Sequence, residues 1–285
     1  MENSTFTITG EKIAQYIQYL RSEERADNTI DKYTRDIRAF AAYLGGAPVT
    51  KEGAIAWKEI LGATHGAASI NSMLAAANGL FAYYGLGIMV KPLRTQTSFL
   101  PDGRVLTLDE YERLLWAAEA AGDERLYHMM QAMCATGARV GELRHFTVEA
   151  AAAGFAEVTN KGKTRVVLIP GELREGLLGY ARRQGIESGC IFVTKSGKPV
   201  DRTSVWRAMK RLCVAAGVDE AKVFPHSLRS LFSRMVHAEA NDLAVLAELL
   251  GHSDINTTRA YVREGATKYR AVVESLGLAR RRWVT

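Results

Sequence analysis

The chain has 285 residues, of which 47% are hydrophobic and 24% are charged, a balance typical of a globular protein rather than a disordered or fibrous one. Its 37 Lys and Arg against 31 Asp and Glu give a net charge of +6, which fits an anionic partner such as nucleic acid and, equally well, an ordinary soluble surface. Three cysteines without a metal-ligand or redox spacing, a polar N-terminus and the lack of a long apolar run argue against a disulfide scaffold, a signal peptide and a membrane span, so we expect a cytoplasmic protein.

Residues 1–88 are predicted to form a small unit of four helices. The clearest helical signal is a row of apolar residues at alternating gaps of three and four, typical of one buried helix face: Ile30, Tyr33, Ile37, Phe40 and Leu44. Asp27 or Asn28 is expected to cap this helix, and Gly45-Gly46 to end it. The other helices are expected near residues 13–20, near residues 57–60 and over residues 69–84.

Residues 89–104 are predicted to be a linker, because Pro92, Pro101 and Gly103 interrupt a polar stretch without periodicity. The stretch is basic, so it fits either a segment that crosses a phosphate backbone or a plain tether.

Residues 105–285 are predicted to form a second, larger unit. Thr107 and Glu110 have the spacing of a capping box that begins a helix, and a later helix over residues 124–136 should end at Gly137. Strands at 155–158 and 165–169 around a polar segment predict a β-hairpin. Helical patterns dominate from residue 172 onward. The expected fold class is therefore mainly α, with a small β-hairpin in the second unit.

Two features of the second unit carry functional groups whose meaning is open when each is taken alone. His226 and Arg229 are three residues apart, just after Pro225, so they would share a face at a helix start and fit either a phosphate clamp or two surface charges. Tyr261 follows a segment with Gly251-His252, and an isolated tyrosine there is typical of a half-buried core residue.

Four segments taken together resemble the tyrosine recombinases, the family of phage integrases and Xer-type enzymes. They occur in the family's order: Thr136-Gly-x-Arg139-x-x-Glu142-Leu, Lys161-Gly-Lys-Thr-Arg165 in the hairpin, His226-x-x-Arg229, and Leu250-Gly-His252 with Tyr261 nine residues later. The helical first unit, with Thr29, Tyr33 and Phe40, resembles the family's SAM-like core-binding domain. The resemblance therefore spans essentially the whole chain and implies a C-terminal catalytic recombinase domain.

The resemblance implies that Tyr261 attacks a DNA phosphodiester and forms a 3′-phosphotyrosyl link, releasing a 5′-hydroxyl. Covalent catalysis of this kind conserves the energy of the phosphodiester bond. It also implies that Arg139 and Arg229 hold the two non-bridging oxygens, because a guanidinium fork supplies fixed donors to the extra negative charge of the transition state.

The remaining roles are also implied by the resemblance. Lys161 is expected to protonate the leaving 5′-oxygen, although the hairpin is one residue shorter than in many members and Lys163 is an alternative acid or a phosphate contact. His226 is expected to act as a base toward Tyr261 or to orient the phosphate, and His252 to donate to a non-bridging oxygen. Glu142 is expected either to orient catalytic groups or to make an ordinary ion pair.

No cofactor and no metal are expected: the chain has no ATP-binding loop, and its carboxylates do not cluster as in a two-metal nuclease. The expected partner is double-stranded DNA, with backbone contacts guessed from charge and helix position at Thr29, Lys32, Ser69, Lys163, Arg202, Ser204 and Arg207. Residues 267–278 read as a terminal helix that family members often pass to a neighbour, so we expect a tetramer on paired DNA sites and a monomer in free solution.

The expected function is therefore site-specific DNA recombination on short inverted repeats. One alternative is a type IB topoisomerase-like enzyme, which shares the tyrosine chemistry but relaxes DNA without a paired site. Another is a DNA-binding protein that has lost catalysis, against which the full set of six catalytic residues argues.

Overall fold

A computed structural model describes residues 6–94, 105–160, 163–252, 254–262 and 275. The chain divides into two compact units, residues 1–97 and 98–285. Each unit has its own hydrophobic core, so each is described by itself.

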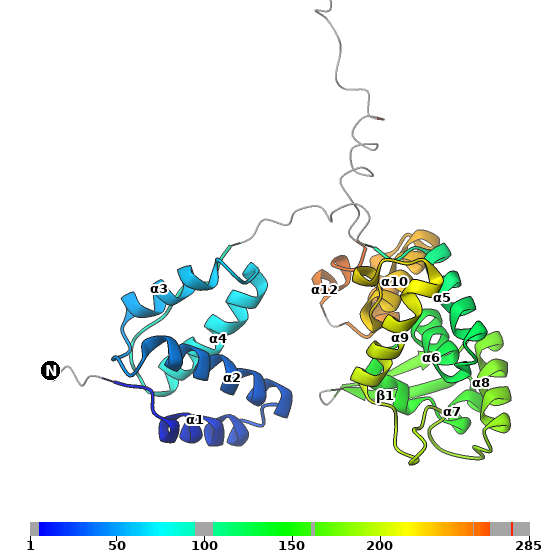
Figure 1. Ribbon diagram of the computed structural model, residues 1–285, viewed down its shortest axis with the longest axis horizontal. Coiled ribbons are helices and arrows are strands. Elements are labelled where there is room, and N and C mark those ends of the chain that lie inside the picture. The colour runs from blue at the N-terminus through cyan, green and yellow to red at the C-terminus, as the bar shows by residue number, and fades with distance from the viewer. Residues whose placement is uncertain (1–5, 95–104, 161–162, 253, 263–274, 276–285) are drawn as a thin grey trace, which may run out of the picture. The chain divides into compact units, whose positions relative to one another are not determined.

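The described part of the first unit holds four helices (Figure 1), α1 (Gly10–Ser22), α2 (Asp27–Leu44), α3 (Lys51–Leu61) and α4 (Ala67–Tyr83). The predicted apolar row on α2 is confirmed, since Ile30, Ile37 and Phe40 are buried. The predicted side-chain cap of α2 is wrong: the residue before the helix is Ala26, and no side chain caps the helix. Gly45 ends α2 as predicted, with a φ of 56°.

Two asparagines of α4 fasten the chain that leaves the first unit. The side-chain amide of Asn78 accepts from the N–H of Val90 and donates to its carbonyl, both at 2.9 Å. Asn71 makes the same pair of bonds with Leu93, at 2.7 and 2.9 Å. Val90 is also buried in the core. The packed unit therefore continues past residue 88, into the start of the segment that the sequence predicts as a linker.

The helices of the second unit surround a central α6, which packs on α5, α8 and α10 (Figure 1). Its described helical segments are α5 (Leu108–Ala120), α6 (Glu124–Thr136), the 3₁₀ turn η1 (Val140–His145), α7 (Val148–Ala153), α8 (Gly171–Arg183), α9 (Arg202–Ala216), the 3₁₀ turn η2 (Glu220–Lys222), α10 (Pro225–Ala240), α11 (Leu243–Leu250) and α12 (Ile255–Arg259). The capping box of α5 is confirmed, because Glu110 N–H donates to Thr107 Oγ1 and Thr107 N–H donates to Glu110 Oε2.

The predicted β-hairpin is present as two antiparallel strands, β1 (Phe155–Asn160) and β2 (Lys163–Leu168). Both strands reach further into the polar segment than predicted. Thr159 and Thr164 face each other across the strands, with their hydroxyl oxygens 3.0 Å apart. A pair of β-branched threonines stabilises strand pairing, so the polar residues extend the ladder instead of forming a loop.

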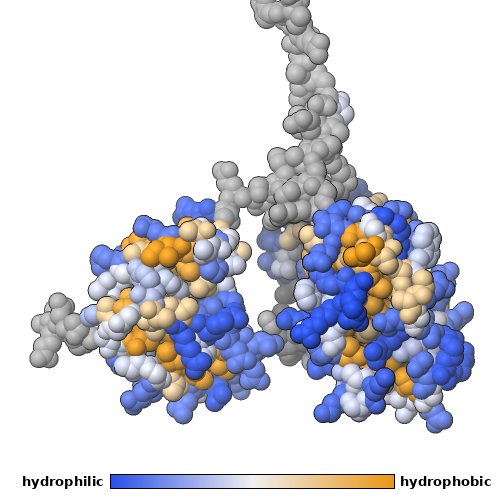
Figure 2. Space-filling model, viewed as in Figure 1, coloured by the Kyte–Doolittle hydropathy of each residue, from blue (hydrophilic) through white to orange (hydrophobic). Residues whose placement is uncertain are grey.

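The fold is thus mainly helical with one small antiparallel sheet, as the sequence predicts. Within the described residues, no helix is both long and apolar enough to cross a membrane. On the face drawn in Figure 2, the surface of each unit mixes hydrophilic residues with small hydrophobic patches.

Candidate active site

Gly137 sets the geometry at the C-terminal end of α6. Its φ of 64° is left-handed, and a Cβ at this position would lie 2.5 Å from Cδ1 of Phe232 on α10. Only glycine combines this backbone with such a close approach. The sharp turn ends α6 and leads directly into Arg139, at the start of η1.

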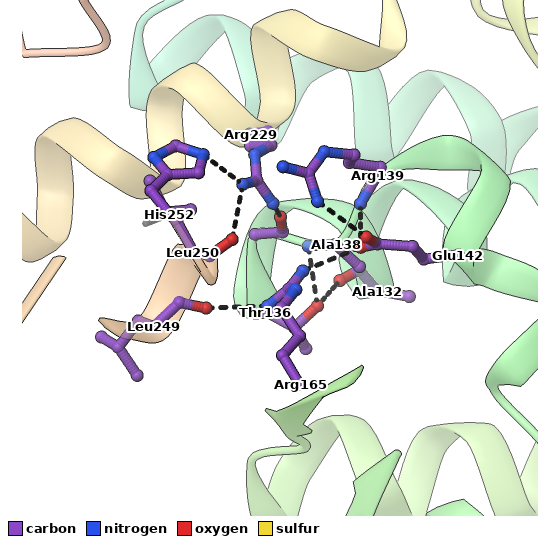
Figure 3. A network of polar contacts seen from close by, with 11 residues as sticks. Ala132, Thr136, Ala138, Arg139, Glu142, Arg165, Arg229, Leu249, Leu250 and His252 are labelled. Carbon is purple, nitrogen blue, oxygen red and sulfur yellow. Dashed lines mark hydrogen bonds and ion pairs between the residues drawn. The ribbon is translucent and has the colours of Figure 1, made fainter. Parts of the chain in front are cut away.

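Arg229 is a fully buried cation where α6, α10 and the end of α11 meet (Figure 3). Its guanidinium donates to the carbonyl of Gly137, to the carbonyl of Leu250 at 3.0 Å and to Nε2 of His252 at 3.0 Å. Burial, and then the nearby Arg139, lower the pKa of Arg229 to about 10, so the guanidinium remains charged at neutral pH. The site therefore holds a positive charge that carbonyls orient but do not neutralise.

Glu142 is a buried carboxylate that joins two arginines (Figure 3). Its Oε1 accepts from the Arg139 guanidinium, and its Oε2 accepts from the Arg139 N–H and the Arg165 guanidinium, all at 2.8 Å. Burial raises the pKa of Glu142, but the Arg139 N–H and the two guanidinium groups outweigh it, so the net pKa is lowered. Glu142 is therefore ionised and fixes the side chain of Arg139.

Arg165 is a member of this network to which the sequence assigned no role. It lies on β2, and its guanidinium donates to the carbonyl of Leu249 at 2.8 Å as well as to Glu142. A Cβ on Gly251 would lie 2.3 Å from Cδ of Arg165, so the arginine stem packs directly beneath that glycine. Side chains alternate between the two faces of a strand, so Arg165 on β2 lies on the same face as the buried Val167. An arginine at a core-facing strand position was the sequence signal that could have identified this residue.

Tyr261 lies just after α12, between the two site histidines. The centroid of its ring is 5.1 Å from that of His226 and 5.5 Å from that of His252. The guanidinium carbon of Arg229 is 5.6 Å from the ring centroid of Tyr261. The structure therefore brings together His226, Arg229, His252 and Tyr261, which come from α10, the end of α11 and the end of α12.

Both histidines of the site have a lowered pKa. Burial is the largest cause for His226, followed by the charges of Arg229 and Arg139. Burial and then Arg229, Arg139 and Arg165 lower the pKa of His252 to about 4. Both rings are therefore neutral at neutral pH in the DNA-free protein, and each retains a nitrogen lone pair that can accept a proton.

Acid should destabilise the second unit in part through His252. Between pH 6.5 and about 4, unfolded His252 binds a proton that folded His252 does not, so the free energy of unfolding falls as the pH falls through this window. Thermal unfolding at pH 7 and pH 4.5 measures the loss, and His252→Asn should reduce it. The matched control is His65→Asn at an exposed position of the first unit, which should leave the loss unchanged. An equal loss in wild type and His252→Asn would contradict this expectation.

The remaining predicted site residues are Lys161, Lys163 and the expected DNA contacts. β1 ends at Asn160 and β2 begins at Lys163, so Lys161 lies outside the described residues, and Lys163 is described only by its backbone in β2. The other guessed DNA contacts occupy exposed or half-buried positions on α2, α4 and α9: Thr29, Lys32, Ser69, Arg202, Ser204 and Arg207. Lys32 already pairs with Asp36 and Ser204 with Asp201, each at 2.5 Å.

Gly137→Ala should destabilise the second unit and displace Arg229. The left-handed backbone alone costs about 1–2 kcal/mol for a residue with a Cβ, and the clash with Phe232 adds to this. Gly154→Ala is a matched control, because its φ is 83° but nothing lies within 4 Å of the added Cβ. Urea unfolding should show a larger loss for Gly137→Ala than for Gly154→Ala. Equal losses would mean that the Phe232 contact is not a constraint.

Among the described residues, no three His, Cys, Asp or Glu side chains gather as a metal site. The guanidinium of Arg229 lies by the Tyr261 ring, and Glu142 joins two further arginines of the network, Arg139 and Arg165.

Comparison with known proteins relates both units to one family. The model of the phage integrase family matches residues 104–267, and the model of the phage integrase N-terminal SAM-like domain matches residues 13–84. Among curated relatives, tyrosine recombinase XerA of Pyrococcus furiosus is 28% identical over 281 residues, covering 95% of this chain and 96% of that protein. Tyrosine recombinase XerC of Erythrobacter litoralis is 29% identical over 286 residues, covering 92% and 90%.

Solved structures with low sequence identity share the fold. The XerH recombinase in a post-cleavage complex with palindromic difH aligns with a TM-score of 0.73 and 17% identity, covering 96% of this chain and 90% of that one. A lambda integrase tetramer bound to a Holliday junction aligns with a TM-score of 0.72 and 19% identity, covering 99% and 81%. Since the integrase model matches more than half of its residues, the chain belongs to the phage integrase family.

Proposed function

We propose that the protein is a tyrosine site-specific recombinase, which cuts and rejoins duplex DNA through a covalent bond to Tyr261. The observation that carries the proposal is the position of the Tyr261 ring, beside His226, His252 and the buried guanidinium of Arg229. A tyrosine that faces a neutral imidazole and a fixed cation is placed to lose its proton and to meet a phosphate.

In the proposed reaction, the hydroxyl oxygen of Tyr261 attacks the scissile phosphorus and forms a phosphotyrosyl bond to the 3′ side of the break. The proton of that hydroxyl passes to His226, whose lowered pKa leaves it neutral and able to accept. The bond from phosphorus to the 5′-oxygen breaks, and Lys161 donates a proton to that oxygen. Lys163 is the alternative donor, or a contact to a neighbouring phosphate. The reverse sequence rejoins the strand.

Arg139 and Arg229 are proposed to hold the two non-bridging oxygens. The pentavalent transition state carries more negative charge than the phosphodiester, so fixed donors lower its energy more than that of the ground state. Glu142 fixes Arg139, and the carbonyls of Gly137 and Leu250 fix Arg229. Because these groups are oriented before DNA arrives, little reorganisation is needed in the reaction. Arg165 holds Glu142 from the hairpin side.

Both units are proposed to bind the duplex: the SAM-like first domain, predicted over residues 1–88 and packed on into the segment 89–104, and the catalytic domain of residues 105–285. Arg202, Arg207 and Ser69 are exposed and are proposed to contact phosphates. We further propose a monomer in free solution, a tetramer on two synapsed sites, and action in the cytoplasm.

The test begins with the DNA site. Selection of duplexes bound by a Tyr261→Phe variant from a random library defines a selected site. A plasmid with two copies of this site is then incubated with wild-type protein in excess EDTA. We expect recombinant products without metal or ATP, since the arginines supply the positive charge. Relaxed plasmid without recombinants would favour the topoisomerase-like alternative, and no strand breakage at all would favour a protein that only binds DNA.

A further inference from the structure

Both ring nitrogens of His252 have a hydrogen-bond partner, and the two partners together determine its tautomer. Nε2 lies 3.0 Å from a terminal nitrogen of Arg229, and Nδ1 lies 3.0 Å from Oγ1 of Thr258. A guanidinium nitrogen can donate a hydrogen bond but cannot accept one. Nε2 must therefore be the acceptor, so the neutral ring carries its proton on Nδ1 and donates it to Thr258.

Thr258 connects this ring to the proposed nucleophile. It is a fully buried residue of α12, three positions before Tyr261. Its hydroxyl oxygen accepts from His252, while its carbonyl accepts from the N–H of Tyr261 at 3.0 Å. One threonine thus sets the orientation of the His252 ring and contacts the backbone of Tyr261.

We propose that Thr258 is a positioning residue, which holds His252 as the Nδ1–H tautomer in the DNA-free protein, so that Nε2 gains a proton only when a phosphate docks. The role of this proton rests on the proposed function, in which His252 donates to a non-bridging oxygen. The tautomer itself does not rest on it. With Nδ1–H committed to Thr258, Nε2 can donate to the phosphate only if the ring becomes a cation.

The charges around His252 explain why Nε2 stays unprotonated until a phosphate binds. The charges that act on it are Arg229 from α10, Arg139 at η1 and Arg165 from β2, and the Tyr261 ring contacts it from beyond α12. Glu142 pairs with Arg139 and Arg165, and His226 contacts the same Tyr261 ring. Three cations and one carboxylate leave this pocket positive, which disfavours a fourth cation. A phosphate brings negative charge, which favours protonation of Nε2 while Nδ1–H remains on Thr258.

The tautomer can be measured without DNA, by ¹⁵N NMR of histidine-labelled protein at neutral pH. We expect a pyrrole-type signal for Nδ1 of His252 and a pyridine-type signal for Nε2. Thr258→Val has nearly the same shape but leaves Nδ1–H without an acceptor, so the ring should turn away from its contact with Arg229 and the two tautomers should mix. Thr258→Ser should restore the wild-type signals. A proton on Nε2 in the wild type, or unchanged signals in Thr258→Val, would overturn the proposal.

The second measurement uses DNA. Tyr261→Phe protein bound to the selected duplex should show both nitrogens of His252 as pyrrole-type, because the ring has become a cation. A ring that stays neutral on DNA would overturn the proton-uptake step while leaving the free tautomer intact.

Kinetics separate a positioning role from a merely structural one. We use duplexes with a nick at successive positions of the selected site, so that cleavage traps the covalent adduct. Thr258→Val should form the adduct about tenfold more slowly, as expected for one buried hydrogen bond lost in the transition state. Thr258→Ser should recover the rate, and DNA affinity should not change. Equal slowing by Thr258→Val and Thr258→Ser would overturn the proposal.

Thr257→Val is the matched control, because Thr257 is the exposed neighbour on the same helix and should react at the wild-type rate. If even the wild type forms no adduct, the proposed function fails, whereas the NMR of the free protein still decides the tautomer.

Discussion

Arg229→Lys should lower the rate of DNA cleavage by about 10²–10³-fold, the usual effect of removing one fixed donor from a developing anion. A lysine ammonium is a compact charge that cannot span the carbonyls of Gly137 and Leu250 and also keep a hydrogen bond to His252. The loss should appear in the rate of adduct formation on the nicked duplex. DNA affinity should change little, because one buried cation contributes little to the many phosphate contacts of a bound duplex.

The substitution should also lower the free energy of unfolding, by about 1–3 kcal/mol, because buried carbonyls lose their donors. Arg234→Lys separates the two effects. Arg234 lies on the same helix, and its guanidinium donates to the carbonyl of Leu106. We expect this control to lose stability but to cleave normally well below its unfolding temperature. If both variants lose cleavage equally, stability rather than phosphate binding explains the Arg229 result.

Tyr261→Phe should abolish cleavage, a loss of roughly 10⁴-fold or more, as when a covalent nucleophile is removed. The phenylalanine ring can still occupy the space between His226 and His252, so folding and DNA binding should be retained. Gel-shift and adduct assays on the same nicked duplex measure the two properties side by side.

Two control variants sharpen this prediction. Tyr127→Phe removes a hydroxyl of α6 that accepts from Gln131 and should cleave normally. Tyr269→Phe removes the next tyrosine of the chain after Tyr261 and should also cleave normally. An adduct that persists in Tyr261→Phe but disappears in Tyr269→Phe would contradict this prediction and identify Tyr269 as the nucleophile.

Local signals in the sequence predicted most of the fold. The apolar row of α2, the capping box at Thr107 and the glycine at the end of α6 each act within a few residues, so periodicity and turn chemistry are sufficient. The same rules were less reliable where side chains compete with local preferences. The cap of α2 is absent, and Thr159 and Thr164 pair across the hairpin instead of forming its loop.

The candidate site was predicted through motif residues, whereas the contacts that orient them were not. Arg165 reaches Leu249 across 84 positions, and Arg229 reaches Gly137 across 92, so no local pattern indicates either bond. Thr258 resembles any threonine on a short helix until its distance to His252 is known. Likewise, the attachment of Val90 and Leu93 to the first unit depends on two asparagine amides of α4, which composition does not reveal.

The most direct test of the account is to identify the residue that becomes joined to DNA. Wild-type protein is trapped on the nicked duplex, digested with trypsin and analysed by mass spectrometry. Cleavage after Arg259 and Arg263 isolates Tyr261 in the peptide 260–263, whereas Tyr269 falls in a separate peptide. We expect a 3′-phosphoryl nucleotide on peptide 260–263. A nucleotide on any other peptide, a link through a 5′-phosphate, or no adduct would contradict it.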